Sequence, residues 1–143
     1  MSILDKLLSV NVAEFETPQE ATFKSKQLAK ALGQRDAVEI TVKELPVRRC
    51  KQMISDQFNK KGDFDFERNQ RAQARLVADG VKDPDLRDAR LREHFGCETP
   101  ADLAEKLFGF EVTKISDLIL SLSGFESGDE DEAEKEQEEL KND

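Results

Sequence analysis

The chain has 143 residues, of which 37% are hydrophobic and 37% are charged, and its aromatic residues are nine Phe with no Trp or Tyr. This size and composition suit one small globular domain with solvated segments and speak against a two-domain enzyme. The formal net charge is −9; residues 126–143 carry −8 of it, from ten acidic and two basic side chains, which leaves −1 for residues 1–125. Phosphate neutralisation is therefore excluded as the main task of the whole surface.

The uneven charge also divides the chain. Residues 126–143 have almost nothing apolar to bury, so we expect a domain at 1–125 followed by a disordered acidic tail at 126–143. No stretch approaches the roughly 20 apolar residues of a membrane span, and the first residues lack the pattern of a secretory signal. These features predict a cytosolic protein, in which Cys50 and Cys97 are ordinary reduced thiols because no CxxC pair is present.

The N-terminal third predicts a short helix and a β ribbon. Residues 3–8 carry apolar side chains spaced for one or two helical turns, and Thr17-Pro18 interrupts that pattern. Within Ala37–Leu45, the apolar residues Val38, Ile40 and Val42 alternate with the polar residues Glu39, Thr41 and Lys43, which is typical of a half-buried strand. A strand needs a partner, and we expect it around Ala21–Lys26, joined through a helical turn that stops near Gly33. The two strands then form a small antiparallel ribbon.

Two helices are predicted next. Pro46 suits the first turn of a helix, and four apolar residues then recur at helical spacing and are expected to face the core: Val47, Cys50, Ile54 and Phe58. Lys60-Lys61-Gly62 is the expected end of this helix, because cations and a glycine suit a helix C-terminus. A second helix is expected from Glu67 to Asp79, with Gly80 as its stop and with inward side chains at Ala72, Leu76 and Val77.

The C-terminal half predicts three further helices. A turn at Asp83–Asp88 precedes a short helix that ends at Gly96, and Thr99-Pro100 is a strong helix start because Thr caps and Pro fits the first turn. The most apolar segment, Val112–Leu122, follows and ends at Ser123-Gly124. The predicted fold is therefore mainly α with a small antiparallel β ribbon, an α+β protein of several short helices packed around one core.

The residue types that carry catalysis or bind metals form no recognisable site. His94 is the single histidine. The sequence spacing between His94, Cys50 and Cys97 is not typical of a metal-binding site or of a nucleophilic dyad. Asp63–Glu67 resembles the start of a calcium loop but has Arg68 where that loop needs glycine. The seven glycines are scattered singly, so no phosphate-binding loop is present. We expect a protein that is not an enzyme, with no cofactor and no catalytic or metal-binding residue.

Two features of the sequence are candidates for a nucleic-acid-binding site. Arginines on outward helix faces are interleaved with acidic residues, which favours a solvated face over a binding patch. Thr99–Leu122 has the length of a helix-turn-helix, but its second helix carries Lys114 as its lone cation, opposed by Glu111 and Asp117. A small DNA-binding protein that uses residues 99–122 stays the alternative hypothesis.

The apolar side of the last helix also has two interpretations. It can complete the core, or it can bind a partner, since helix-in-groove binding needs several apolar anchors at such spacing. Leu120 points away from the main apolar arc on a helical wheel, so it meets either a second layer of the fold or another chain. The candidate partner-binding residues are Val112, Ile115, Leu118, Ile119, Leu120 and Leu122.

The succession of C-terminal segments resembles the XkdN-like tail assembly chaperones of contractile-tailed phages and PBSX-type prophages. The segments that carry the resemblance are Leu76–Leu86, Leu91–Gly96, Thr99-Pro100 and Ile119–Phe125, and looser N-terminal features extend it over residues 1–125. The resemblance implies a non-enzymatic protein of the host bacterial cytoplasm that binds the tape measure protein, keeps it soluble during tail tube assembly and is absent from the mature virion. It also implies, as further partners, a longer frameshifted form of the chain and the tail tube protein. Nucleic acid and membrane are not expected as partners, and a homo-oligomer is left open.

Overall fold

The computed structural model describes residues 2–125. In chain order these residues form α1 (Ile3–Leu8), α2 (Val12–Glu16), β1 (Glu20–Ser25), α3 (Lys26–Ala31), β2 (Val38–Lys43), α4 (Val47–Asp56), α5 (Phe66–Gly80), β3 (Val81–Asp83), α6 (Ala89–His94), α7 (Pro100–Phe108) and α8 (Glu111–Leu122). The mainly helical fold with a small antiparallel sheet is confirmed. The expected acidic tail lies outside the described residues.

The three strands lie in the order β1-β2-β3 and are antiparallel. The ribbon is the expected one, with Phe23 of β1 opposite Ile40 of β2. Ile40 and Val42 are buried while Glu39 is exposed, so the alternation in the sequence gives the inner and outer faces correctly. Strand β3 was not predicted. It follows α5 directly and pairs Val81 with Val42, and three residues are too few to show an alternating pattern.

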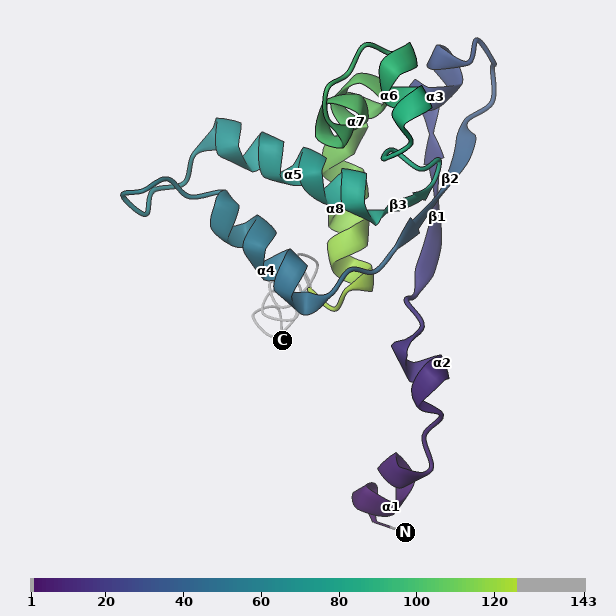
Figure 1. The fold of residues 1–143 in the computed structure, drawn as a ribbon, viewed down its shortest axis with the longest axis vertical. Helices are drawn as coiled ribbons and strands as arrows, with labels where there is room; N and C mark the ends of the chain where they lie inside the picture. The colour runs from purple at the N-terminus through teal and green to yellow at the C-terminus, as the bar shows by residue number, and fades with distance from the viewer. Residues whose placement is uncertain (1, 126–143) are drawn as a thin grey trace, which may run out of the picture.

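Helix α5 is the centre of the helical layer. It packs against α4, α7 and α8, and α8 also contacts β1 and β2, so α8 lies between α5 and the sheet. Figure 1 shows this body with two projections, the α4–α5 hairpin and an N-terminal arm formed by α1 and α2. The largest fully buried side chains include Ile40, Leu76, Leu86, Leu103, Phe108, Ile115 and Ile119. A Cβ at Gly80 would lie 2.9 Å from Cγ1 of Ile119, so this glycine permits the close approach of α5 and α8.

The helix starts follow local capping signals. The Thr99 hydroxyl accepts a hydrogen bond from the backbone N–H of Asp102 at 3.1 Å, and Asp88 accepts one from the N–H of Arg90 at 2.9 Å. Each bond satisfies an N–H group that the first helical turn leaves without a partner. The predicted starts of α6 and α7 are confirmed.

The predicted core face of α4 is wrong in part. Cys50 is buried, but Val47, Ile54 and Phe58 are exposed, and Met53 takes the second buried position. Helix α4 packs mainly against α5 and projects with it from the body (Figure 1), so these outer side chains stay exposed. The helix also ends at Asp56, before the expected Lys60-Lys61-Gly62 stop, because residues 57–65 form a separate turn.

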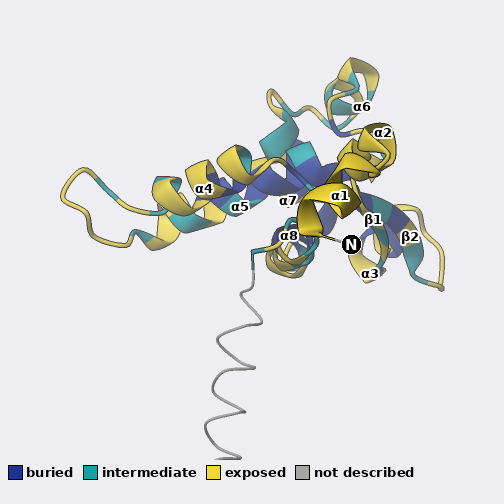
Figure 2. Ribbon diagram, turned by 90° about the horizontal axis from the view of Figure 1, so that it is seen from below, coloured by how far each residue is buried: buried dark blue, intermediate teal, exposed yellow. Residues whose placement is uncertain are grey.

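The N-terminal arm has no buried residue. Helices α1 and α2 are capped by Ser2 and Asn11, whose side chains accept hydrogen bonds from Asp5 N–H and Glu14 N–H at 3.2 Å each. The local sequence therefore favours both short helices, and α1 coincides with the predicted one. Figure 2 shows the arm in the exposed colour throughout. It contributes nothing to the core of its own chain.

Candidate functional site

The six candidate partner-binding residues of α8 lie in or against the core. Val112, Ile115, Ile119 and Leu120 are buried, while Leu118 and Leu122 are partly buried and pack against the same cluster. Leu120, 8% exposed, meets a second layer, since α8 has α5 on one side and the sheet on the other. Partner binding by these six residues stays a prediction, and in this conformation a partner can reach only Leu118 and Leu122.

The start of α8 instead makes a contact within the chain. The Glu111 carboxylate accepts hydrogen bonds from the Ser25 hydroxyl at 2.7 Å, Lys26 N–H at 2.9 Å and Gln27 N–H at 3.3 Å. Ser25 itself accepts a bond from Leu28 N–H at 2.9 Å as the cap of α3. The carboxylate thus binds the N-terminus of α3, where a negative charge is favourable. Sequence reasoning missed this role, because the partners lie about 85 residues away along the chain.

Exposed aromatic side chains gather at the end of the α4–α5 hairpin. We call Ile54, Phe58, Phe64 and Phe66 the hairpin surface; all four are exposed, and Phe66 reaches 69%. The rings of Phe58 and Phe64 meet edge to face with their centroids 6.3 Å apart. Aromatic residues held in this way are characteristic of binding surfaces, because they offer large apolar area with few rotatable bonds.

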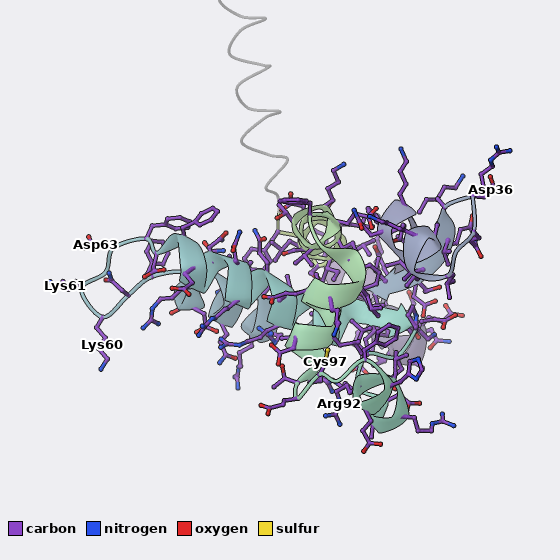
Figure 3. The ribbon with its side chains drawn as sticks, turned by 90° about the horizontal axis from the view of Figure 1, so that it is seen from above. Asp36, Lys60, Lys61, Asp63, Arg92 and Cys97 are labelled. Atoms are coloured by element: carbon purple, nitrogen blue, oxygen red, sulfur yellow. The ribbon has the colours of Figure 1, made fainter. Side chains whose placement is uncertain are left out.

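The turn that carries these rings is held by its own hydrogen bonds. Asn59 accepts hydrogen bonds through its side-chain oxygen from Lys61 N–H at 2.9 Å and Asp63 N–H at 3.0 Å. Asp65 N–H also donates to the Gln57 carbonyl at 2.9 Å. Figure 3 shows Lys60, Lys61 and Asp63 at the tip, far from the rest of the body. The hairpin therefore presents an ordered apolar surface with charged residues beside it.

A second group of exposed apolar side chains lies on the N-terminal arm. We call its members the arm surface: Ile3, Leu4, Leu7, Leu8, Val12 and Phe15. Phe15 is 79% exposed. Scattered exposed apolar residues are normal in proteins, but six of them on one short projecting segment without a buried residue are typical of an interaction site.

The arginines of α5 border a groove of about 610 Å³ between α4, α5 and α7. Arg49 Nε lies 2.6 Å from the Asp79 carboxylate, and Arg87 pairs with the same carboxylate. Asp102 and Glu105 line the groove as well. Acidic groups therefore offset its positive charge, which favours the predicted solvated face over a phosphate-binding patch.

The described residues contain no assembled catalytic or metal site. Cys50 is buried in α4, and the His94 ring packs edge to face on Phe95 with their centroids 5.2 Å apart. Within residues 2–125, no three His, Cys, Asp or Glu side chains are grouped so that they could hold a metal ion. In the same range, none of the helices has the length and apolar character needed to cross a bilayer.

The described residues thus form a helical body from which two segments with exposed apolar side chains project. The chain belongs to the XkdN-like phage tail assembly chaperones: the model of the family described as "Phage XkdN-like tail assembly chaperone protein, TAC" matches residues 4–141. The resemblance read from the sequence is thereby confirmed, and the role of the family is a chaperone role, not a catalytic one.

One solved structure shares the fold. The crystal structure of the protein YqbN has 17% sequence identity to this chain and a TM-score of 0.52, over 78% of this chain and 92% of that one. At this identity the likeness speaks for the fold alone. No curated protein matches the chain.

Proposed function

We propose that this tail assembly chaperone binds apolar helical segments of the tape measure protein and keeps that protein soluble until tail tube subunits assemble around it. The observation that carries the proposal is the hairpin surface, an ordered group of exposed aromatic side chains in a chain of this family. A long helical partner with apolar stripes would aggregate through those stripes, and aromatic side chains that cover them would prevent it.

The hairpin surface is the proposed contact because it is accessible without any change of fold. The six α8 residues stay a second proposed contact, for which Leu118 and Leu122 are partly accessible and the other four require α8 to move. Moving α8 would expose both α5 and the sheet, which makes this second route costly.

The test is co-expression of the chain with a tape measure protein of the same phage, followed by measurement of the soluble fraction and co-purification. The double variant Phe58→Ser and Phe64→Ser removes the two rings at the tip, and Phe110→Ser is the matched control on the exposed α7–α8 turn. Removing a central binding group costs about 2 kcal/mol or more, which weakens binding roughly 30-fold. We expect the double variant to stay folded and lose the tape measure protein, while the control keeps it.

Three outcomes would contradict the proposal. If the folded double variant still co-purifies with the tape measure protein, the hairpin surface is not the contact. If the wild type never co-purifies with it, the partner is a different one. If the wild type binds duplex DNA with an affinity that falls steeply with salt, the alternative function through residues 99–122 is supported instead.

We also propose that the chaperone acts in the host bacterial cytoplasm and is absent from the mature virion, as expected of a protein that the tail tube displaces. Mass spectrometry of purified virions tests this, since stoichiometric amounts of the chain in the particle would contradict it. The longer frameshifted form and the tail tube protein are the further partners we propose, and pull-down with the same bait tests both.

A further inference from the structure

We propose that the acidic segment 126–143 docks along the outer face of α4, where it neutralises cations that have no acidic partner among the described residues. Three observations carry the proposal: the charge of that face, the charge of the segment, and the place where the segment begins. The contact itself is independent of tape measure binding. Only its regulatory consequence, given after the argument, rests on the proposed function.

The outer face of α4 carries cations without acidic neighbours. Residues 45–55 contain Arg48, Arg49 and Lys51 and no acidic residue. Arg48 and Lys51 are exposed, on the side of the helix that points away from its buried residues. Arg49 instead turns toward α5 and pairs with Asp79. In the part of the chain that the structure describes, Arg48 and Lys51 form no ion pair.

The acidic residues that flank this face are engaged elsewhere. Glu44, just before α4, accepts a hydrogen bond from Gln19 N–H at 2.8 Å. Asp56, at the end of α4, lines a groove together with Arg68 and Arg71 of α5. The positive charge of the outer face is therefore available to an anionic partner.

The segment 126–143 has the complementary charge. It contains ten acidic and two basic residues, a net charge of −8, and its apolar side chains are limited to Ala133 and Leu140. Charges attract one another over about 10 Å at an ionic strength near 0.1 M, and this attraction needs no fixed side-chain geometry. The segment is therefore suited to neutralise a row of cations and unsuited to fill an apolar pocket.

The segment also begins beside α4. The Ser123 hydroxyl accepts a hydrogen bond from Leu45 N–H at 2.9 Å, which holds the end of α8 close to the start of α4. Figure 1 shows these two helix ends next to each other. An extended chain spans about 3.3 Å per residue, so the 18 residues of the segment are longer than α4, which measures about 15 Å. The segment can therefore follow the whole helix.

A second basic stretch, residues 21–35, is less suited to this contact. It contains four cations and no acidic residue, but Lys24 stands opposite Glu39 in the ribbon. Helix α3 follows the end of β1 that is remote from Leu45, and a strand of six residues spans about 20 Å. The effective concentration of a tethered group falls as the distance it must span grows. Attachment beside α4 therefore favours α4 over α3.

The contact has a consequence for partner binding, and this consequence rests on the proposed function. Ile54, a member of the hairpin surface, lies one helical turn after Lys51. A segment held at Lys51 therefore lies beside the hairpin surface. A tape measure segment that covers Ile54 brings apolar contacts that residues 126–143 cannot offer, so it should displace them. The acidic segment would then occupy α4 only while no partner is bound.

Paramagnetic relaxation in the full chain tests the contact. A nitroxide is attached to Gln137→Cys in a Cys97→Ser background, in which Cys50 is buried and does not react. At low salt, we expect the label to broaden the amide signals of α4 more than those of α3. This difference should be lost in roughly 0.5 M salt, where the screening length falls to about 4 Å.

Two charge variants separate electrostatic docking from simple attachment nearby. Arg48→Gln with Lys51→Gln should remove the excess broadening of α4. Lys30→Gln with Arg35→Gln is the matched control, because it removes the same charge from exposed positions at the other end of the sheet, and it should keep the broadening. Circular dichroism should be unchanged in both, since all four side chains are exposed.

Two results would overturn the docking. Excess broadening that survives Arg48→Gln with Lys51→Gln would come from covalent attachment alone. Broadening of α3 that equals or exceeds that of α4 would place the segment elsewhere. Tape measure protein added to the labelled chain should abolish the broadening of α4, and a complex that keeps it would overturn the displacement. Failure of the tape measure protein to bind at all would contradict the proposed function and leave the result on docking intact.

Discussion

Gly80 provides a sharp test of the packing between α5 and α8. A Cβ at this position would lie 2.9 Å from Cγ1 and 3.1 Å from Cγ2 of Ile119, and closer still to its Cδ1. Ordinary carbon contacts lie near 3.5–4.0 Å, so Ile119 must shift. Ile119 is fully buried, so its side chain cannot relieve the contact by moving out into solvent. We therefore expect Gly80→Ala to strain the core.

The net effect is the difference of two opposed contributions. Overpacking costs about 1–3 kcal/mol, occasionally more. Replacing glycine by alanine in a helix gains at most about 1 kcal/mol in propensity. Gly80→Ala should therefore lower the free energy of unfolding by about 1–2 kcal/mol. Ile119→Ala alone should cost about 2–5 kcal/mol through the cavity it leaves. In that background the added methyl of Gly80→Ala meets no clash and partly fills the cavity, so the effect should change sign.

Urea unfolding followed by circular dichroism measures all four proteins of this cycle. With a slope of about 1–3 kcal/mol per molar, Gly80→Ala should lower the midpoint by roughly 1 M. The coupling between the two sites should be about 2 kcal/mol, within the range seen for residues in contact. Equal effects of Gly80→Ala in both backgrounds would refute the proposed close contact between α5 and α8.

Three further predictions follow from other contacts. Glu111→Ala should lower stability by about 1–3 kcal/mol, because it removes three hydrogen bonds at the start of α3, and an unchanged urea midpoint would contradict the contact. The pKa of the Asp88 carboxyl is lowered from 3.8 to about 2, first by the side-chain hydrogen bond from Arg90 and then by the Arg90 N–H. Its stabilising contribution is therefore present above pH 3.8 and lost as the pH falls toward 2; NMR titration should show this midpoint, and Arg90→Ala should raise it. Ile40→Asp should unfold the protein by burying an unpaired carboxylate, whereas Glu39→Ala should leave the circular dichroism melting curve nearly unchanged.

The elements that sequence reasoning identified are those with local causes. Alternation identifies β2, the Thr99 cap with the following proline identifies α7, and the turn at Asp83–Asp88 identifies the start of α6. Each signal involves residues within a few positions of one another, so no knowledge of the tertiary fold is needed. The same holds for α1, whose cap and apolar spacing are both local.

The features that sequence reasoning missed depend on what packs from a distance. Strand β3 exists because Val81 meets β2, and its three residues carry no pattern of their own. Periodicity placed Ile54 and Phe58 in a core, but a helical stripe does not tell whether a third element will cover it, and the hairpin leaves the body before one can. Leu120 lies off the main apolar arc of the helical wheel because α8 is covered on two sides, by α5 and by the sheet.

For the candidate site, too, the sequence does not show which apolar side chains become buried and which stay exposed. Apolar spacing selected α8 as a partner surface because it is the most apolar helix, although strong apolar character is equally what a central core helix requires. The exposed hairpin surface reads in sequence as an ordinary Phe-containing turn. The signal that could have found it is the density of Phe around Asn59, since Phe58, Phe64 and Phe66 are three of the nine Phe in the chain.

The position of α8 has a consequence for how the chain is made. The Ser123 hydroxyl accepts a hydrogen bond from Leu45 N–H across 78 residues, and Glu111 binds Ser25 across 86. At about 5–20 residues per second, the ribosome needs roughly 4–16 s to synthesise the stretch between the ribbon and its cover. During that interval the apolar face of the ribbon is bare, so ribosome-bound chains stalled before α8 should be cleaved by protease within β2 more readily than chains that include it. The sheet of this tail assembly chaperone therefore stays without its α8 cover until α8 itself has been synthesised.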